Sequence, residues 1–299
     1  MKLPISGQLW RLLANPPYKH PLYRRSAVPR VGPEWLRGVT GLLSPAAPAL
    51  YLVLISFACL SIASGSVALL LILAALAIFV FNGTYYGMGW TLRIAGELAA
   101  ERERKAYDLL CLLPGGALGL VQAVAAGVMH REYAFRKRYE RHRGLLIGIL
   151  VFLLALSLVG LFGRGGIDGE IVVMYALIFG VLGASYADFV QSVVLSALVG
   201  VFAGHYTVRR LDSELWALLL FLALQLGIYT FAIIAGFVVL PPLVDLTGLP
   251  GWQRELLLVV LRFAALVGTR ELVVSLFWRL LAKRLNVPAG QLDALRAAT

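Results

Sequence analysis

The amino-acid sequence predicts an all-α, polytopic membrane protein: a six-helix transmembrane bundle with a cytoplasmic amphipathic helix. Of its residues, 60% are hydrophobic and only 14% are charged, whereas charged residues make up about 25% of an ordinary soluble domain. The mean hydropathy is +0.82. Apolar runs that reach the roughly 20 residues needed to cross a bilayer alternate with segments that hold most of the charge.

The apolar runs divide into six expected helices. The run from Pro48 to Trp90 is too long for one crossing, and the small polar residues at 61–66 predict a hairpin break. The run 171–206 fits either two short crossings divided at 185–191 or one long helix. One helix keeps the later Lys and Arg residues on the cytoplasmic side, as the positive-inside rule prefers, so one is predicted. The expected helices are 47–63, 66–92, 145–162, 171–206, 215–240 and 255–281.

Charge then predicts the orientation and the domain boundaries. Seventeen of the 27 Lys and Arg residues lie within 1–143, which places the Pro/Arg-rich arm 1–47 and the segment 93–143 in the cytoplasm. The transmembrane domain is 48–285, and a short tail, 286–299, follows. We therefore expect a multi-pass protein of the inner (plasma) membrane with both termini in the cytoplasm.

A repeated pattern of small residues links the second and fourth expected helices. Gly83-x3-Gly87 is followed by Arg93 and Glu97, and Gly200-x3-Gly204 is followed at the same spacing by Arg210 and Glu214. Small residues four apart let helices approach closely in lipid. The pattern predicts that the two helices leave the membrane on the same side.

The charged stretch 97–116, ELAAERERKAYDLLCLLPGG, directly follows the second helix. At helical period, its polar stripe contains Glu97, Glu101, Arg104, Lys105 and Asp108. Its apolar stripe contains Ala106, Leu109, Leu110 and Leu113. Pro114-Gly115-Gly116 predicts the helix end. We expect an amphipathic helix whose polar stripe faces a cytoplasmic partner; the alternative is an interfacial helix that only covers lipid headgroups.

The same residues resemble a motif in permease subunits of type 2 ABC exporters, E-R-E-x-G-T-[LW]-[ED]-L-L-x-x-T-P. The family's Gly-Thr pair is replaced by Ala106 and its neighbours, and its last Thr by Leu113. The resemblance implies a coupling helix seated on a nucleotide-binding ATPase subunit, and a complex with a second permease copy or paralogue. The matching residues are Glu101, Arg102, Glu103, Asp108, Leu109, Leu110 and Pro114.

Motifs for chemistry within this chain are missing from the sequence. There is no G-x-x-x-x-G-K-[ST] phosphate loop, H-E-x-x-H, G-x-S-x-G or C-x-x-C. Cys59 and Cys111 form no metal-ligand pattern with the scattered histidines. We expect no catalytic residue, metal or cofactor in this chain, with ATP and Mg²⁺ bound by the ATPase partner.

The net charge of +11 comes partly from the segment 130–143, HREYAFRKRYERHR. Basic residues interleaved with aromatics can bind RNA. Next to a membrane helix they more often contact anionic lipid, so the sequence predicts lipid binding and no nucleic acid.

Four ionisable residues fall inside expected membrane helices: Asp188, Arg262, Arg270 and Glu271. Such groups are costly in lipid and face the bundle interior or a cavity. They predict either a substrate path or interhelical ion pairs, with Asp188 paired to Arg270 or Glu271 neutralising Arg270.

Together these features predict the transmembrane subunit of an exporter driven by a separate ATPase. The principal rival is a non-transporting membrane scaffold or assembly subunit with the same fold. A weaker rival is an intramembrane enzyme, disfavoured by the missing catalytic motifs.

Overall fold

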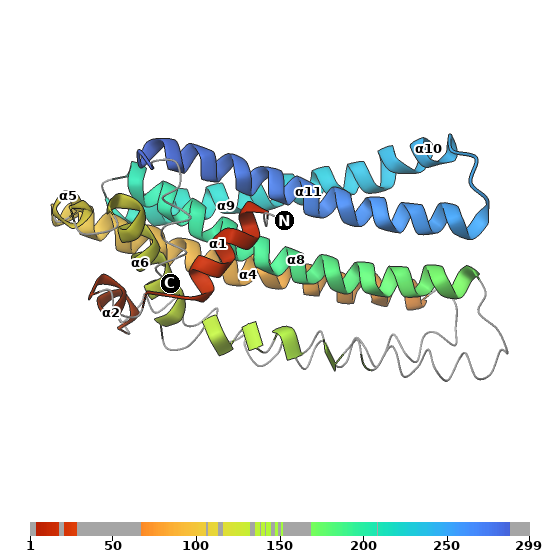
Figure 1. Ribbon diagram of the computed structural model, residues 1–299, viewed down its shortest axis with the longest axis horizontal. Helices are drawn as coiled ribbons and strands as arrows, with labels where there is room; N and C mark the ends of the chain where they lie inside the picture. Colours follow the sequence, from red (N-terminus) through yellow and green to blue (C-terminus); the bar gives the residue numbers. More distant parts are fainter. Residues whose placement is uncertain are drawn as a thin grey trace.

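The computed structural model describes residues 4–17, 21–28, 67–105, 107–112, 116–131, 169–207 and 209–287, together with parts of 135–151. Within these residues the chain is all α-helical, without a strand. Four long helices run along the molecule's long axis (Figure 1). They are α4 (Val67–Glu103), α8 (Gly169–Tyr206), α9 (Arg210–Ile233) and α11 (Gly251–Arg284).

Contacts between the helices show the relative directions of α4, α8 and α9. A Cβ at Gly83 would lie 2.8 Å from Asp188 Oδ2, and one at Gly204 would lie 2.9 Å from the Ala95 carbonyl oxygen. Contacts therefore advance together along α4 and α8, which run parallel. The prediction that both helices leave the membrane on the same side agrees with their parallel direction. The glycines lack a side chain, which allows the two helices to approach this closely. In α9, Phe221 faces Gly87 while the later Tyr229 faces Thr84, so α9 runs antiparallel.

α8 is one uninterrupted helix of 38 residues, which confirms the prediction of a single helix over 171–206. α9 is longer than expected, because it continues through a π-helical turn, η3 (Ile234–Val239), into α10 (Leu240–Asp245). Pro241 and Pro242 lack the N–H groups that would bond carbonyls one turn earlier, which accounts for the departure from α geometry there. The predicted loop from Pro241 is therefore wrong over its first five residues.

Two helical segments of the described chain are long and apolar enough to cross a membrane, Tyr175–Tyr206 and Arg210–Asp245. They indicate membrane association. α11 is also long, but Arg262, Arg270 and Glu271 interrupt its apolar character. The expected helices 47–63 and 145–162 lie wholly or mostly outside the described residues, so the six-helix bundle remains a prediction.

Three shorter helices cover one side of the bundle near one end: α1 (Ile5–Ala14), α2 (Pro21–Ala27) and α6 (Gly116–His130). We call them the jacket. α6 is buried from Leu118 to Met129, so this apolar helix, too short to cross a membrane, is an internal packing element. A Cβ at Gly127 would lie 2.6 Å from Ser26 Cβ, which shows how closely α2 and α6 approach.

Candidate functional site

The middle of the bundle contains a buried ion pair between Asp188 of α8 and Arg270 of α11. Both side chains are only 1% exposed. The predicted pairing of these two residues is confirmed. The pair joins two helices that are far apart in the sequence. Each charge needs its partner, because an unpaired charge at this position would cost several kcal/mol.

Neutral polar groups complete the arrangement, which we call the central network. Arg270 donates hydrogen bonds to Ser192 Oγ and Gln225 Oε1, each at 2.9 Å, and Gln225 Nε2 donates to the same hydroxyl at 3.0 Å. Tyr229 donates to Asp188 Oδ1 at 3.1 Å, and its ring lies 4.8 Å from the Arg270 guanidinium. The network therefore holds α8, α9 and α11 in one register.

The sequence analysis missed the neutral members of this network. Gln225 is the one amide between Leu215 and Val244, in a stretch without any charged residue. That isolation was a usable signal, because a polar side chain in an apolar helix normally finds a partner across a helix interface. Ser192 and Tyr229 gave no comparable signal.

Glu271 and Arg262 lie outside the network. Glu271 accepts hydrogen bonds from the Ser6 backbone N–H at 3.1 Å and from Gln191 Nε2 at 3.3 Å, so it ties the start of α1 to the bundle. Arg262 donates to the Gly236 carbonyl of η3 at 3.0 Å and lies 4.6 Å from the centre of the Phe237 ring. Glu271 thus fastens the jacket, whereas Arg262 binds the irregular turn.

The expected amphipathic helix over 97–113 is not one helix, and that prediction is wrong. α4 continues to Glu103, the chain turns at Arg104 and Lys105, and a short helix, α5 (Tyr107–Cys111), follows. Lys105 has a φ of 56°, which no α-helix accommodates. The packing of Ile94, Ala95 and Leu98 in the bundle core extends α4 beyond the predicted boundary. Pro114 and the side chains of Asp108 and Leu109 lie outside the described residues.

The prediction that the polar stripe faces a partner is wrong for its first two members. Glu97 and Glu101 are only 9% and 5% exposed, because the jacket covers them. Glu97 pairs with Arg131 at 3.5 Å, and Glu101 pairs with Arg25 of α2 at 3.0 Å. Periodicity identified the polar face correctly but could not show that other parts of the same chain cover it.

The next two residues also bind within the bundle. Arg102 donates to the carbonyl of His205 at the end of α8. Glu103 accepts the backbone N–H of Arg210 at 2.9 Å, which places a carboxylate at the positive N-terminus of α9. We call Glu101, Arg102 and Glu103 the end clamp, because they join the end of α4 to α2, α8 and α9.

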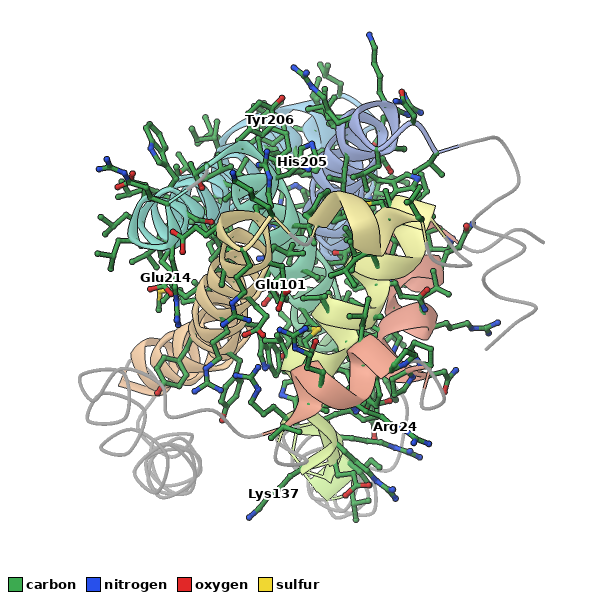
Figure 2. All side chains as sticks on the ribbon, turned by 90° about the vertical axis from the view of Figure 1, so that its left-hand side faces the viewer. Arg24, Glu101, Lys137, His205, Tyr206 and Glu214 are labelled. Carbon is green, nitrogen blue, oxygen red and sulfur yellow. The ribbon has the colours of Figure 1, made fainter. Side chains whose placement is uncertain are left out.

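Beyond the end clamp, α5 forms the tip of the bundle (Figure 1). Tyr107 and Leu110 pack against the core, whereas Leu112 is 81% exposed. Arg104 contacts Glu101 at 3.4 Å, and its side chain is about half exposed. Figure 2 looks onto this end and shows Glu101 inside the helices, with Glu214 and Lys137 at the periphery.

The basic segment 130–143 packs along the bundle in its described part. Phe135 is buried and lies against Trp10, while Arg136 and Lys137 are exposed. His142 stacks on Phe189 of α8, with ring centroids 4.4 Å apart. Burial lowers the pKa of His142 from 6.5 to about 4. Among the described residues of the segment, Phe135 and His142 thus pack on the bundle and Arg131 binds Glu97, whereas Arg136 and Lys137 face outward.

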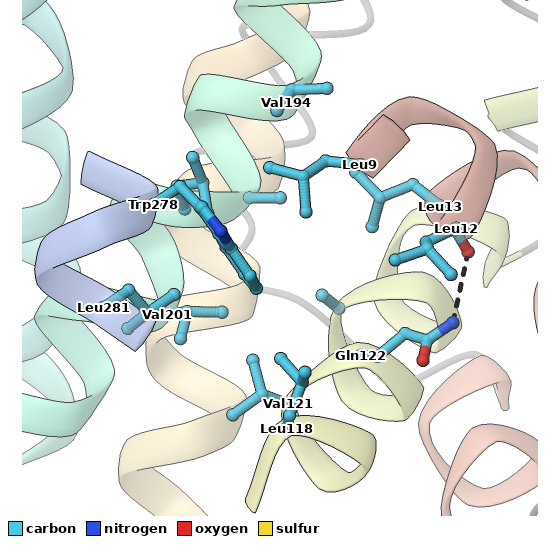
Figure 3. Close-up of a pocket in the computed structure, with 13 residues that line it drawn as sticks. Leu9, Leu12, Leu13, Leu118, Val121, Gln122, Val194, Val201, Trp278 and Leu281 are labelled. Atoms are coloured by element: carbon cyan, nitrogen blue, oxygen red, sulfur yellow. Dashed lines mark hydrogen bonds between the residues drawn. The ribbon is translucent and has the colours of Figure 1, made fainter. Parts of the chain in front are cut away.

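A narrow apolar cavity lies between α1, α6, α8 and α11 (Figure 3). Leucines and valines of these helices and Trp278 line it. Its one polar lining residue, Gln122, donates to the Leu12 carbonyl at 3.5 Å. The cavity holds no group that could perform chemistry.

The described residues contain no group of three His, Cys, Asp or Glu side chains that could hold a metal ion. Comparison of the chain with protein-family models, with curated proteins and with solved structures finds no match. The candidate sites therefore rest on geometry: the central network, which links the long helices, and the end clamp with the α5 tip.

Proposed function

We propose that this chain is a multi-pass membrane subunit of an exporter whose ATP-hydrolysing subunit is a separate protein. The observation that carries the proposal is the position of the motif residues. Those that the structure describes lie at the extremity of the bundle, where the end clamp joins α4 to three other helices and the α5 tip exposes Leu112. A partner bound at this tip could bias the arrangement of α2, α8 and α9, provided that it binds two arrangements unequally.

Helix lengths support a specific membrane position. Along α8, Gly169 to Asp188 spans roughly 28 Å at 1.5 Å per residue, close to the roughly 30 Å of a hydrocarbon core. Trp252 packs against Gly169, as aromatic residues do at a membrane interface. At the other limit, the exposed charges of Arg136 and Glu140 flank Tyr139, which contacts Tyr186. We therefore assign the bilayer to the part between Gly169 and the central network, and a cytoplasmic extension to the rest.

Labelling of single cysteines tests this membrane position. In a background lacking Cys59 and Cys111, a Thr247→Cys variant should react with an impermeant maleimide added to intact cells. A Lys137→Cys variant should react only after permeabilisation. External labelling at Lys137 would overturn the orientation.

Co-purification tests the exporter function. Leu112→Asp should abolish binding of a nucleotide-binding subunit and its stimulated ATPase rate, because it places a charge on the apolar tip. Val28→Asp is the matched control, since Val28 is another exposed apolar residue, 56% exposed, and directly follows α2. Equal losses in the two variants would mean that the tip is not the contact.

The second candidate is a non-transporting membrane scaffold. The positions of Glu97 and Glu101 favour the scaffold, because both side chains bind arginines of their own chain and are not exposed for contact with another protein. If no ATPase co-purifies with the unmodified protein, the scaffold takes the place of the exporter.

A further inference from the structure

Cationic side chains gather at the end of α8, next to the ends of α4 and α11. Arg102, in the last turn of α4, donates a hydrogen bond to the carbonyl of His205. Arg284, the last residue of α11, has its guanidinium carbon 5.3 Å from the centre of the Tyr206 ring. Figure 2 looks onto this end and shows His205 and Tyr206 close together. We call Arg102, His205 and Arg284 the α8-end cluster.

Capping of α8 explains only part of this cluster. The C-terminus of a helix carries roughly half a negative charge, and Arg102 bonds directly to the His205 carbonyl there. One full positive charge already exceeds that half charge. Arg284 and its neighbour Lys283 are both exposed and add two more. The sum is a net positive field at the end of α8, which a bound anion would neutralise.

No carboxylate in the described part of the chain balances this charge. The charged groups that act on the His205 ring are Arg102 and Arg284, and both are cations. Arg284 forms no hydrogen bond or ion pair with the residues that the structure describes. The sequence over 272–292 contains no Asp or Glu. The end of α11 therefore brings positive charge to the cluster without an acid of its own.

Two acids at the same end of the bundle bind elsewhere. Glu103 accepts the backbone N–H of Arg210 at 2.9 Å, and Glu214 binds the side chain of the same arginine at 2.9 Å. In Figure 2, Glu214 lies apart from His205 and Tyr206. These carboxylates thus serve the start of α9 and leave the α8-end cluster positive.

The donors of the cluster suit a phosphate group. The planar guanidinium fork of arginine matches phosphate oxygens, to which it donates two parallel hydrogen bonds. Among the described residues, Arg102 donates a hydrogen bond only through Nη1, so its other N–H groups can reach a ligand. The contact with the Tyr206 ring restricts the side chain of Arg284. This restriction reduces the entropy that Arg284 would lose on binding.

We propose that the α8-end cluster binds a phosphate group, with Arg284 as the principal ligand and Arg102 and His205 beside it. Two sources of phosphate share this chemistry. The candidate spans Tyr175–Tyr206 and Arg210–Asp245 both reach the cluster, so a bilayer along their full length presents a lipid headgroup there. A bilayer that ends at the central network leaves the cluster in the cytoplasm, where a soluble phosphate binds. The site goes beyond the exporter function and needs no ATPase partner.

Native mass spectrometry of the purified protein tests the lipid source. With phosphatidylglycerol and phosphatidylcholine added at equal concentrations, the unmodified protein should retain phosphatidylglycerol preferentially. Arg284→Gln should retain one phosphatidylglycerol fewer per chain. Arg279→Gln is the matched control and should retain as many as the unmodified protein. It removes an exposed charge from the same helix, and Arg279 is not among the groups that act on the His205 ring.

Thermal unfolding in inorganic phosphate tests the soluble source. At constant ionic strength, phosphate in place of chloride should raise the melting temperature to a plateau, because a ligand bound only by the folded state stabilises it. Arg284→Gln should lose this rise, and Arg279→Gln should keep it.

A difference between the two variants in either measurement supports the site and identifies the source. A lipid source would move the bilayer limit from the central network to the end of α8. If neither phosphatidylglycerol nor inorganic phosphate binds, or if the two variants respond alike, the proposal is overturned. Neither measurement contains an ATPase, so a failure of the exporter function would leave the site intact.

Discussion

The central network and the end clamp are both built from acidic and basic side chains, yet they differ in their surroundings. In the network, Asp188 and Arg270 are both 1% exposed, and neutral groups of α8 and α9 form hydrogen bonds with Asp188 Oδ1 and with the two terminal nitrogens of Arg270. In the end clamp, Glu101 is buried, but its partner Arg25 is about half exposed. The charged groups of the network are therefore shielded from water, whereas Arg25 in the clamp is exposed to it.

This difference separates two structural roles. A pair inside a low-dielectric core is costly to break, because the remaining partner stays buried and charged. A pair with one exposed member loses less, because water replaces the missing partner. We infer that the network keeps the long helices in register throughout, and that the clamp is where the jacket can detach.

Breaking the network should give the largest effect. Arg270→Leu leaves Asp188 buried without its cation, and we expect a loss of roughly 3–5 kcal/mol in the free energy of unfolding. The measurement is thermal unfolding of the purified protein in detergent, together with its yield. The double variant Asp188→Leu/Arg270→Met removes both charges and should recover most of the loss. If the double variant is as unstable as Arg270→Leu, packing and not charge explains the effect.

Acid should weaken the attachment of the basic segment to the bundle. Because the pKa of His142 is about 4 in the folded protein and 6.5 in the unfolded chain, the unfolded chain takes up a proton first as the pH falls. His142 therefore contributes stability above pH 6.5 that declines between about pH 6.5 and 4, by about 3 kcal/mol in all. His142→Phe should keep the stacking on Phe189 and flatten this part of the pH profile. Unchanged profiles in melts from pH 7 to 4 would contradict the assignment.

The clamp should respond more mildly. Glu101→Gln removes the charge opposite Arg25, and a loss of about 1 kcal/mol is expected for a pair with one exposed member. Because α2 is then held less firmly, tryptic cleavage after Arg25 should accelerate. Glu140→Gln is the control, since the Arg136–Glu140 pair is largely exposed on both sides and its loss should change nothing. Equal cleavage rates in the two variants would mean that Glu101 does not fasten α2.

Sequence reasoning succeeded where a general physical rule could choose between the open alternatives. The run 171–206 allowed one helix or two, and the distribution of Lys and Arg favoured the single helix that α8 forms. The cost of an unpaired charge in an apolar helix predicted a partner for Arg270, which is Asp188. Sequence reasoning failed where distant segments decide the outcome. Glu97 and Glu101 look solvent-facing by periodicity, but α2 and the residue following α6, Arg131, bury them. The covering segments come from before and after α4 in the chain, α2 on one side and Arg131, just after α6, on the other. No local sequence signal shows that these segments cover the two glutamates.

The turn at Lys105 is a backbone feature that the local sequence pattern also failed to predict. A substitution there should give the smallest effect. The φ of 56° at Lys105 costs a residue with a Cβ roughly 1 kcal/mol, which glycine avoids. Lys105→Gly should therefore raise the free energy of unfolding by up to about 1 kcal/mol. The measurement is a small rise in the melting temperature. Lys105→Ala removes the same charge but keeps the Cβ, so it should give no such gain. If alanine stabilises as much as glycine, charge repulsion near Arg104 is the cause, and the turn that divides α4 from α5 carries no backbone strain.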